Sequence, residues 1–254
     1  MVIAFRAAAP VMKCWRQPDL VWHDSHNHGY HHLAMSIRMT YYLDVTSSWC
    51  YWAEQAWSEL KRRYSKSPAE FDWKIALLDS SSMSKSREQL EWFYRRSGTI
   101  VSSPFMLNSA WLDPVMPEFL APNCVAEAAK EFGVKDDSVR LALMAAAIRQ
   151  GKKVADWKIC GEIAAKVSSL NAKKLLVRAQ STEVENRVRH STSAFHALQV
   201  TQRPTFVLES DIGDRAVFSG FWRREPLVAA IDSMLADATA YKSYKAHFGD
   251  PPPA

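Results

Sequence analysis

The stretch 44-DVTSSWCYWAE-54 decides the fold of this chain of 254 residues. It overlaps the end of 40-TYYLDV-45, which is rich in residues that favour β-strands, and the hydroxyl groups of 46-TSS-48 are suited to cap a helix. Apolar side chains then recur at helical spacing, at Trp52, Ala53, Ala56, Trp57, Leu60 and Tyr64. A second apolar run, 71-FDWKIALL-78, follows Pro68. This order predicts a strand, a crossover helix and a second strand parallel to the first.

The rest of the chain predicts a block of helices followed by a hairpin and a last helix. The helical stripes cover about 86–97, 124–132, 141–148, 160–170, 173–179 and 182–198. No fixed period relates these stripes, which argues against a solenoid. The runs 205-TFVLE-209 and 215-RAVFSG-220 predict two strands joined by a turn at 210-SDIGD-214. A helix then begins near Arg224, with Pro226 in its first turn.

This layout predicts an α/β, thioredoxin-like fold with a helical insertion between its β-α-β and β-β-α halves. We expect residues 35–85 and 199–254 to form the thioredoxin-like domain and residues 86–198 to form the inserted helical subdomain. Residues 1–34 show no periodicity and contain the histidine-rich tract 22-WHDSHNHGYHH-32. We expect a disordered extension there, or sequence upstream of a later start; weak metal capture by the imidazoles is the alternative.

Composition excludes several classes of protein. The four cysteines, Cys14, Cys50, Cys124 and Cys160, include no pair at C-x-x-C spacing. This excludes a disulfide-dense scaffold, a zinc ribbon and an ordinary dithiol centre, and we predict no metal site. The net charge is +5, but acids and bases are interspersed, so we expect no nucleic-acid partner. No apolar run approaches the roughly 20 residues that cross a bilayer, and we expect a soluble, cytoplasmic protein without a membrane partner.

Two local features carry chemistry. A helix N-terminus offers free N–H groups and a positive dipole end to an anion such as a thiolate, and Ser47 and Cys50 stand at positions i and i+3 of this junction. In 201-TQRPTFVLE-209, the Arg203–Pro204 bond precedes a strand and can adopt the cis form, which leaves nearby backbone groups free for an extended ligand. Ser47 cannot form a disulfide, so the site cannot cycle as an intramolecular dithiol. Its hydroxyl can instead stabilise a bound thiolate.

The junction at 44–51, the segment 203-RPTFV-207 and the helices between them resemble the DsbA-like branch of the thioredoxin superfamily, over about residues 39–246. That branch includes DsbA-type oxidoreductases, 2-hydroxychromene-2-carboxylate isomerases and kappa-class glutathione transferases. The resemblance places Ser47 at the nucleophilic cysteine of the oxidoreductases and Cys50 at their resolving cysteine. Ser48 replaces a common proline, and Pro204 matches the cis-proline. In the isomerases and transferases, a serine at the Ser47 position hydrogen-bonds the sulfur of glutathione.

We therefore predict Ser47 and Cys50 as catalytic residues. The predicted substrate-binding residues are Ser48, Trp49, Arg203, Pro204, Thr205, Trp222 and Arg223. Within this set, the tryptophans are candidates for an aromatic pocket and the arginines for a ligand carboxylate. The loop 107-LNSAWLDP-114 is expected to frame the mouth of the cleft. The transferases often hold the γ-glutamyl group with a Ser-Asp pair near the last helix, whereas 218-FSGFWRREP-226 has no matching aspartate.

Three functions remain open on the sequence. The first is a glutathione-dependent transferase or isomerase, with glutathione or a similar thiol as co-substrate and an apolar or aromatic small molecule as second substrate. The second is a thiol-disulfide oxidoreductase or chaperone that acts through Cys50 alone. The third is a non-catalytic peptide-binding module, in which Ser47 only caps the helix and Cys50 is a small buried hydrophobe. Related enzymes are often dimers, so the resemblance makes a homodimer an option.

Overall fold

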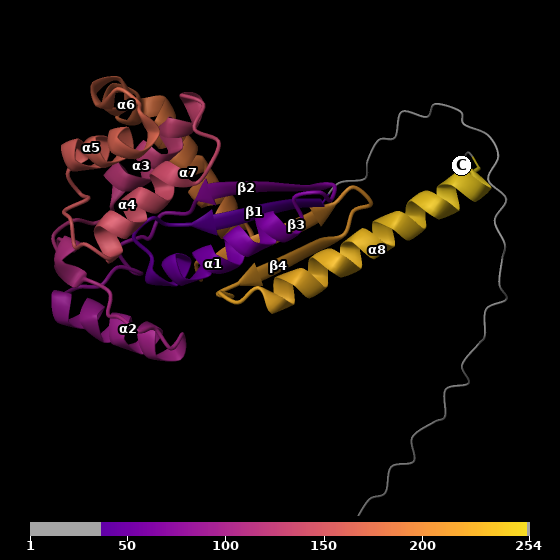
Figure 1. The fold of residues 1–254 in the computed structure, drawn as a ribbon, viewed down its shortest axis with the longest axis horizontal. Coiled ribbons are helices and arrows are strands. Elements are labelled where there is room, and N and C mark those ends of the chain that lie inside the picture. The colour runs from indigo at the N-terminus through magenta and orange to yellow at the C-terminus, as the bar shows by residue number, and fades with distance from the viewer. Residues whose placement is uncertain (1–36, 253–254) are drawn as a thin grey trace, which may run out of the picture. The chain divides into compact units, whose positions relative to one another are not determined.

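A mixed sheet of four strands lies at the centre of the computed structural model, which describes residues 37–252 (Figure 1). In the order of the sheet the strands are β2 (Ala69–Ile75), β1 (Ile37–Leu43), β3 (Thr205–Ser210) and β4 (Arg215–Ser219). The strands β1 and β2 are parallel, and β3 is antiparallel to both β1 and β4. This is the predicted β-α-β and β-β-α arrangement. The expected extension over residues 1–34, with its histidine tract, lies outside the described residues.

The central strand β1 is buried on both faces, which explains its nearly continuous apolar sequence. On one face, Tyr41 packs its ring against Trp57 of the first helix, with 5.2 Å between the ring centroids, and against Phe206 at 4.7 Å. On the other face, the ring of Tyr42 lies 6.0 Å from that of Phe195. Each face of the sheet is therefore covered by helices.

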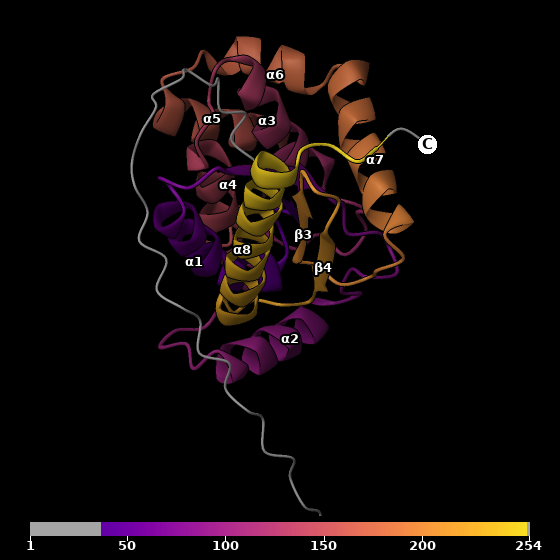
Figure 2. The same cartoon turned by 90° about the vertical axis from the view of Figure 1, so that its right-hand side faces the viewer.

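The structure contains eight α-helices within residues 37–252 and one short 3-10 turn, Ser109–Trp111. The helices are α1 (Ser48–Arg63), α2 (Arg87–Ile100), α3 (Leu120–Glu131), α4 (Ser138–Ile148), α5 (Trp157–Ser168), α6 (Ala172–Ala179), α7 (Thr182–Ala197) and α8 (Glu225–Phe248). Helices α1 and α8 lie side by side on one face of the sheet (Figure 2), where Arg63 and Tyr64 contact Asp232 at 3.1 and 2.7 Å. Helix α7 covers the opposite face.

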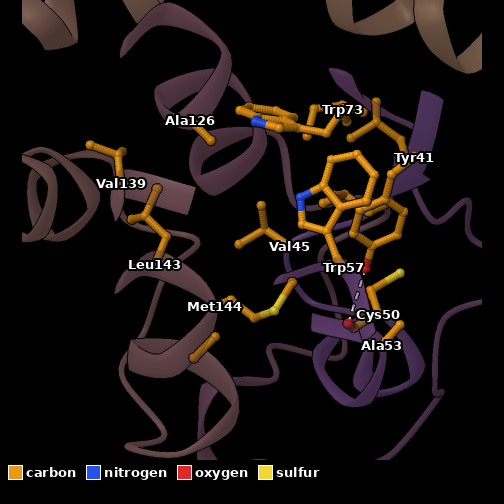
Figure 3. Close-up of a cluster of buried hydrophobic side chains, with 14 of the residues drawn as sticks. Tyr41, Val45, Cys50, Ala53, Trp57, Trp73, Ala126, Val139, Leu143 and Met144 are labelled. Carbon is orange, nitrogen blue, oxygen red and sulfur yellow. Dashed lines mark hydrogen bonds between the residues drawn. The ribbon is translucent and has the colours of Figure 1, made fainter. Parts of the chain in front are cut away.

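The helices of the insertion share one core with the sheet. Apolar side chains from β1 and α1 join those of α3, α4 and α6 in a single buried cluster, part of which Figure 3 shows around Trp57, Leu143 and Met144. Residues 34–254 accordingly form one compact unit. The inserted helices are thus not a body that stands apart from the thioredoxin-like half.

The predicted order of elements is confirmed, but the second strand ends earlier than predicted. Strand β2 covers 69–75, whereas the apolar pattern ran to Leu78. The next residues leave the sheet and bond elsewhere: Leu77 N donates to Thr192 Oγ1 at 3.0 Å, and Leu78 N donates to Asp44 Oδ2 at 3.0 Å. Side chains thus satisfy the backbone N–H groups that have no strand partner, which allows the segment to be buried. The segment leads directly to the site. Across residues 37–252, no helix combines the length and apolar character needed to span a membrane.

Candidate functional site

The junction between β1 and α1 is organised by Ser47, the N-cap residue of α1. Its backbone is extended, with φ −80° and ψ 121°, and its Oγ accepts a hydrogen bond from Cys50 N at 3.3 Å. The predicted cap is therefore present. Ser47 is 7% exposed and lines a pocket. A cap that also lines a pocket can contact a ligand.

Asp44, to which the sequence assigns no role, holds this junction in place. Its Oδ1 accepts from both the N–H and the hydroxyl of Thr46 at 2.7 Å, and its Oδ2 accepts from Leu78 N and Asn123 Nδ2 at 3.0 and 3.1 Å. Asn123 Oδ1 in turn accepts from Val45 N at 3.1 Å. Burial raises the pKa of Asp44, although these hydrogen bonds oppose it. The carboxyl thus ties β1, the end of β2 and α3 together beside Ser47.

The loop before β3 faces this junction, and its Arg203–Pro204 peptide bond is cis. The structure corrects the expectation for the Arg203 side chain, which is buried instead of open to a ligand carboxylate. Its Nε and Nη2 donate to the carbonyls of Ala76 and Leu77 at 2.7 and 2.5 Å, and its guanidinium lies 4.4 Å from the ring centroid of Phe195. Burial lowers its pKa, with Asp44 opposing. Arg203 therefore fixes the cis-proline loop to the end of β2.

Pro204, in this loop, and Thr205, which follows it, are likewise buried. A substrate therefore cannot reach the Thr205 side chain. Thr205 Oγ1 donates to the carbonyl of Gln202 at 2.6 Å, and the Pro204 carbonyl accepts from Gly220 N at 2.8 Å. Thr205 is thereby corrected from a direct substrate contact to a residue that holds the loop, whereas the expected contact through Pro204 stays a prediction.

Ser47 opens into a pocket of about 260 Å³ between α1, α2 and the cis-proline loop. It brings together four of the predicted residues: Ser47, Ser48, Trp49 and Arg203. The remaining lining residues are Thr46, Leu78, Ser82, Met83, Ser84, Leu90, Phe93, Tyr94, Arg96, Trp111, Leu112, Thr201 and Gln202. The pocket thus has both hydroxyl-bearing and apolar, aromatic lining residues, and the loop at 107–114 borders it as expected.

Trp222 and Arg223 do not line this pocket, contrary to the expectation of one shared site. With Trp52 and Arg224 they border a separate hollow of about 350 Å³ between α1 and the start of α8. Arg224 is ion-paired with Glu59 there. The connection between β4 and α8 carries these side chains past the side of α1 instead of its N-terminus.

Cys50 points into the core, and its thiol is not accessible at the pocket. The side chain is fully buried, next to Tyr41, Val45 and Ala53 in Figure 3, and the Tyr41 hydroxyl donates to the Cys50 carbonyl at 3.0 Å. Burial raises the pKa of the thiol to about 12, although hydrogen bonding to Ser47 opposes this. In this arrangement burial disfavours a Cys50 thiolate, and the catalytic role of Cys50 stays a prediction.

The other two described cysteines are also buried, as predicted. Burial raises the pKa of Cys124 to about 12 and raises that of Cys160 as well. Among residues 37–252, no group of three or more His, Cys, Asp or Glu side chains is arranged to hold a metal ion. The site therefore offers a hydroxyl, a helix N-terminus and a pocket, without an accessible thiolate from the described cysteines.

The comparisons with known proteins agree with this geometry. A family model described as a DSBA-like thioredoxin domain matches residues 38–232. No curated protein matches the chain. Among solved structures, a putative protein disulfide isomerase from Nitrosomonas europaea is 18% identical, with a TM-score of 0.64 over 80% of this chain and 98% of that one. A probable DsbA oxidoreductase from Streptomyces coelicolor is 15% identical, with a TM-score of 0.59 over 86% and 92% of the two chains.

A third similar structure is the cytosolic disulfide reductase DsbM from Pseudomonas aeruginosa, solved with GSH. It is 14% identical, with a TM-score of 0.57 over 81% of this chain and 99% of that one. At these identities the structures show a shared fold, and the family model covers most of the described residues. The chain belongs to the family of DSBA-like thioredoxin domains.

Proposed function

We propose that this protein is a glutathione-dependent transferase or isomerase, in which Ser47 stabilises the thiolate of a bound glutathione. The observation that carries the proposal is which residue of the junction lines the pocket and which one is buried. Ser47 lines the pocket at the N-terminus of α1, while the thiol of Cys50 is buried with its pKa raised to about 12. A site built in this way lacks a reactive sulfur of its own and is suited to hold one supplied by a ligand.

The Ser47 hydroxyl has the right hydrogen-bonding capacity for this task. Its oxygen accepts from Cys50 N, and its single hydrogen can be donated to a sulfur in the pocket. The free N–H groups and dipole of α1 add positive potential at the same point. Both effects favour the thiolate over the thiol, and the thiolate is the nucleophile.

The apolar side of the pocket supplies room for the second substrate. Trp49, Phe93 and Leu112 line the same pocket as Ser47. In a transfer, the glutathione sulfur forms a bond to an electrophilic carbon, and the leaving group departs with the bonding electron pair. In an isomerisation, the new carbon–sulfur bond breaks again and glutathione is released unchanged.

Support for glutathione also comes from DsbM, whose structure was solved with GSH and which shares this fold. We extend the ligand to this chain because Ser47 occupies the helix start that faces the cis-proline loop. We further propose a cytoplasmic location, in which thiols are kept reduced, as the word cytosolic describes DsbM.

The test is a titration of the thiolate of bound glutathione by ultraviolet absorbance, with affinity from calorimetry. We expect the pKa of the bound thiol to lie at least about one unit below that of free glutathione. Ser47→Ala should return it most of the way and weaken binding. The control is Ser181→Ala, because Ser181 caps α7 through the same hydrogen bond, to Val184 N at 3.4 Å, away from the pocket. Both variants should cost about 1 kcal/mol of stability, so the thiol pKa and the affinity for glutathione separate them.

Absence of glutathione binding to the wild-type protein at millimolar concentration contradicts the proposal, as does an unchanged thiol pKa in Ser47→Ala. The second candidate is a disulfide reductase acting through Cys50, which the descriptions of the similar structures favour. Intact-mass analysis after treatment with oxidised glutathione decides it. A mixed disulfide that Cys50→Ser abolishes supports this candidate, and adducts that persist in Cys50→Ser exclude it.

A further inference from the structure

Among the residues that the structure describes, Arg96 is the one lining side chain of the Ser47 pocket that combines a positive charge with freedom to bind. Among the described residues, the charged side chains that line the pocket are Arg96 and Arg203, and no acidic side chain lines it. Arg203 already donates to backbone carbonyls. Arg96 is exposed and makes no ion pair with any described residue. The pocket therefore has a net positive lining.

Two aromatic rings of the same helix hold the Arg96 guanidinium in position. Its central carbon lies 5.1 Å from the ring centroid of Trp92 and 5.0 Å from that of Phe93, and Phe93 itself lines the pocket. A guanidinium that contacts aromatic faces keeps its N–H groups available at its edge, where they match the two oxygens of a carboxylate. The stacking also reduces the rotamer entropy that a free arginine loses on binding.

We infer that Arg96 is the carboxylate anchor of this pocket and selects thiol ligands that carry a free carboxylate. This inference rests on the proposed function, because the ligand thiol is assigned to Ser47. The two ends of the pocket then have separate tasks. Ser47 and the N-terminus of α1 recognise the sulfur, and Arg96 on α2 recognises the acidic end of the ligand. A neutral thiol of similar size lacks the second contact and binds more weakly.

The experiment compares Arg96→Gln with Arg95→Gln in calorimetric titrations. Arg95 is the matched control: it is the neighbouring residue on α2, is also exposed and without an ion pair among the described residues, but does not line the pocket. Both changes remove one positive charge from the same helix. We expect Arg96→Gln to weaken the binding of reduced glutathione about 10-fold or more, as loss of a charge-assisted hydrogen bond does. Arg95→Gln should change it less than about 2-fold.

Two modified ligands separate the roles of the two ends. Glutathione diethyl ester has no free carboxylate, so it should bind the wild-type protein about as weakly as glutathione binds Arg96→Gln, and Arg96→Gln should not weaken it further. S-Methylglutathione keeps both carboxylates but has no thiol. Its affinity should remain sensitive to Arg96→Gln and become insensitive to Ser47→Ala.

The outcomes distinguish the inference from the function on which it rests. If glutathione binds the wild-type protein but Arg96→Gln binds it equally well, the anchor is wrong and the proposed function stands. Equal losses in Arg96→Gln and Arg95→Gln also overturn the anchor, because they indicate a diffuse field of positive charge. If glutathione does not bind the wild-type protein, both the function and the anchor are wrong.

Discussion

At the scale of single residues, the chemistry of this site depends on which side chain reaches the pocket. Ser47 and Cys50 are one helical turn apart, yet one lines the pocket and the other is fully buried. Ser47, the N-cap residue, lines the pocket at a point where its backbone is still extended. The residue three positions later already belongs to the helix face that packs on the sheet. The chemical identity of position 47 therefore decides whether the site has its own nucleophile.

This argument predicts the behaviour of Ser47→Cys. The introduced thiol lies at a helix N-terminus, where its pKa falls below the usual value of about 8.5. Its thiolate should attack oxidised glutathione, forming a mixed disulfide and releasing one reduced glutathione. The Cys50 thiol, one turn away, should then displace the second glutathione. Intact-mass analysis should show a product that has lost one H₂ relative to the reduced variant.

The control is Ser47→Cys combined with Cys50→Ser, in which the reaction should stop at the glutathione adduct. If both variants stop at that adduct, Cys50 is too deeply held to act as a resolving thiol.

Some site residues could be predicted from sequence because their signals are local. Ser47 and Trp49 stand beside a helix start, and the cis-proline loop stands directly before a strand. Trp222 and Arg223 were assigned to the wrong pocket because an irregular connection, and not a helix period, sets the direction of their side chains. Arg96 was missed for a related reason. Helical spacing identifies residues that share a face, but it does not tell which face of α2 borders α1.

At the scale of elements, the junction of β1 with α1 is held by side chains from the insertion. Asn123 of α3 donates to Asp44 Oδ2 at 3.1 Å and to the Phe119 carbonyl at 2.9 Å, and accepts from Val45 N. All of these groups except Phe119 belong to the segment that leads into Ser47. A residue 79 positions away in sequence thus fixes the loop that carries the candidate site.

We predict that Asn123→Ala lowers the free energy of unfolding by about 3 kcal/mol, because it leaves buried polar groups of Asp44 and Val45 without a partner. Asn171→Ala is the comparison, since Asn171 makes a single capping bond, to Lys174 N at 3.0 Å, and its loss should cost about 1 kcal/mol. Urea denaturation measures both. Equal losses in the two variants contradict the bridging role of Asn123.

The positions of the helices could be predicted from apolar spacing. The neighbouring elements against which each apolar stripe packs could not. The stripes of α3, α4 and α5 included Phe132, Leu141 and Val167, which are 39%, 40% and 44% exposed. A stripe marks the side of a helix that is apolar, whereas its burial depends on the length and position of the neighbouring helix. The early end of β2 also depends on neighbouring elements. The backbone N–H groups of Leu77 and Leu78, just after the strand, donate to Thr192 of α7 and to Asp44.

At the scale of the whole molecule, a buried ionic cluster joins the sheet half to the insertion. Arg140 of α4 has no exposed side-chain surface; it pairs with both carboxylate oxygens of Glu54 on α1 and with Asp137 at 3.1 Å. Lys61 also pairs with Asp137. Burial pushes the pKa of Asp137 upward, but Arg140 and Lys61 outweigh burial and leave it lowered.

Arg140→Ala should therefore destabilise the protein by about 3–5 kcal/mol, because it leaves buried carboxylates without their counter-charge.

The cluster also predicts a pH dependence. The folded pKa of Asp137 lies below its ordinary value of about 3.9, so its contribution is present above that pH and is lost as the pH falls further. Unfolding measured across this acidic range should show a shallower loss of stability in Asp137→Asn than in the wild-type protein. Parallel curves would show that Asp137 is not linked to folding.

The shared core predicts that residues 34–254 unfold as one cooperative unit. The buried cluster runs from Tyr41 and Trp57 to Leu143 and Leu175 without a break. Calorimetric and van't Hoff enthalpies of unfolding should therefore agree. A second transition assigned to the helices of 86–198 would show that the insertion is an independent unit. The sequence could not decide between one cooperative unit and two, because apolar stripes do not reveal that the sheet half and the insertion share one buried core.

The hydroxyl group of Ser47 determines how the site responds to oxidising conditions. A cysteine thiolate at this position is open to peroxide and passes through sulfenic to sulfinic and sulfonic acids, the last steps being largely irreversible. A hydroxyl has no such series of states, and the thiol of Cys50 is withdrawn into the core with its pKa raised to about 12. The side chain that we propose as the contact of the ligand sulfur therefore needs no reductant for its repair and remains the same chemical group in oxidising and reducing surroundings.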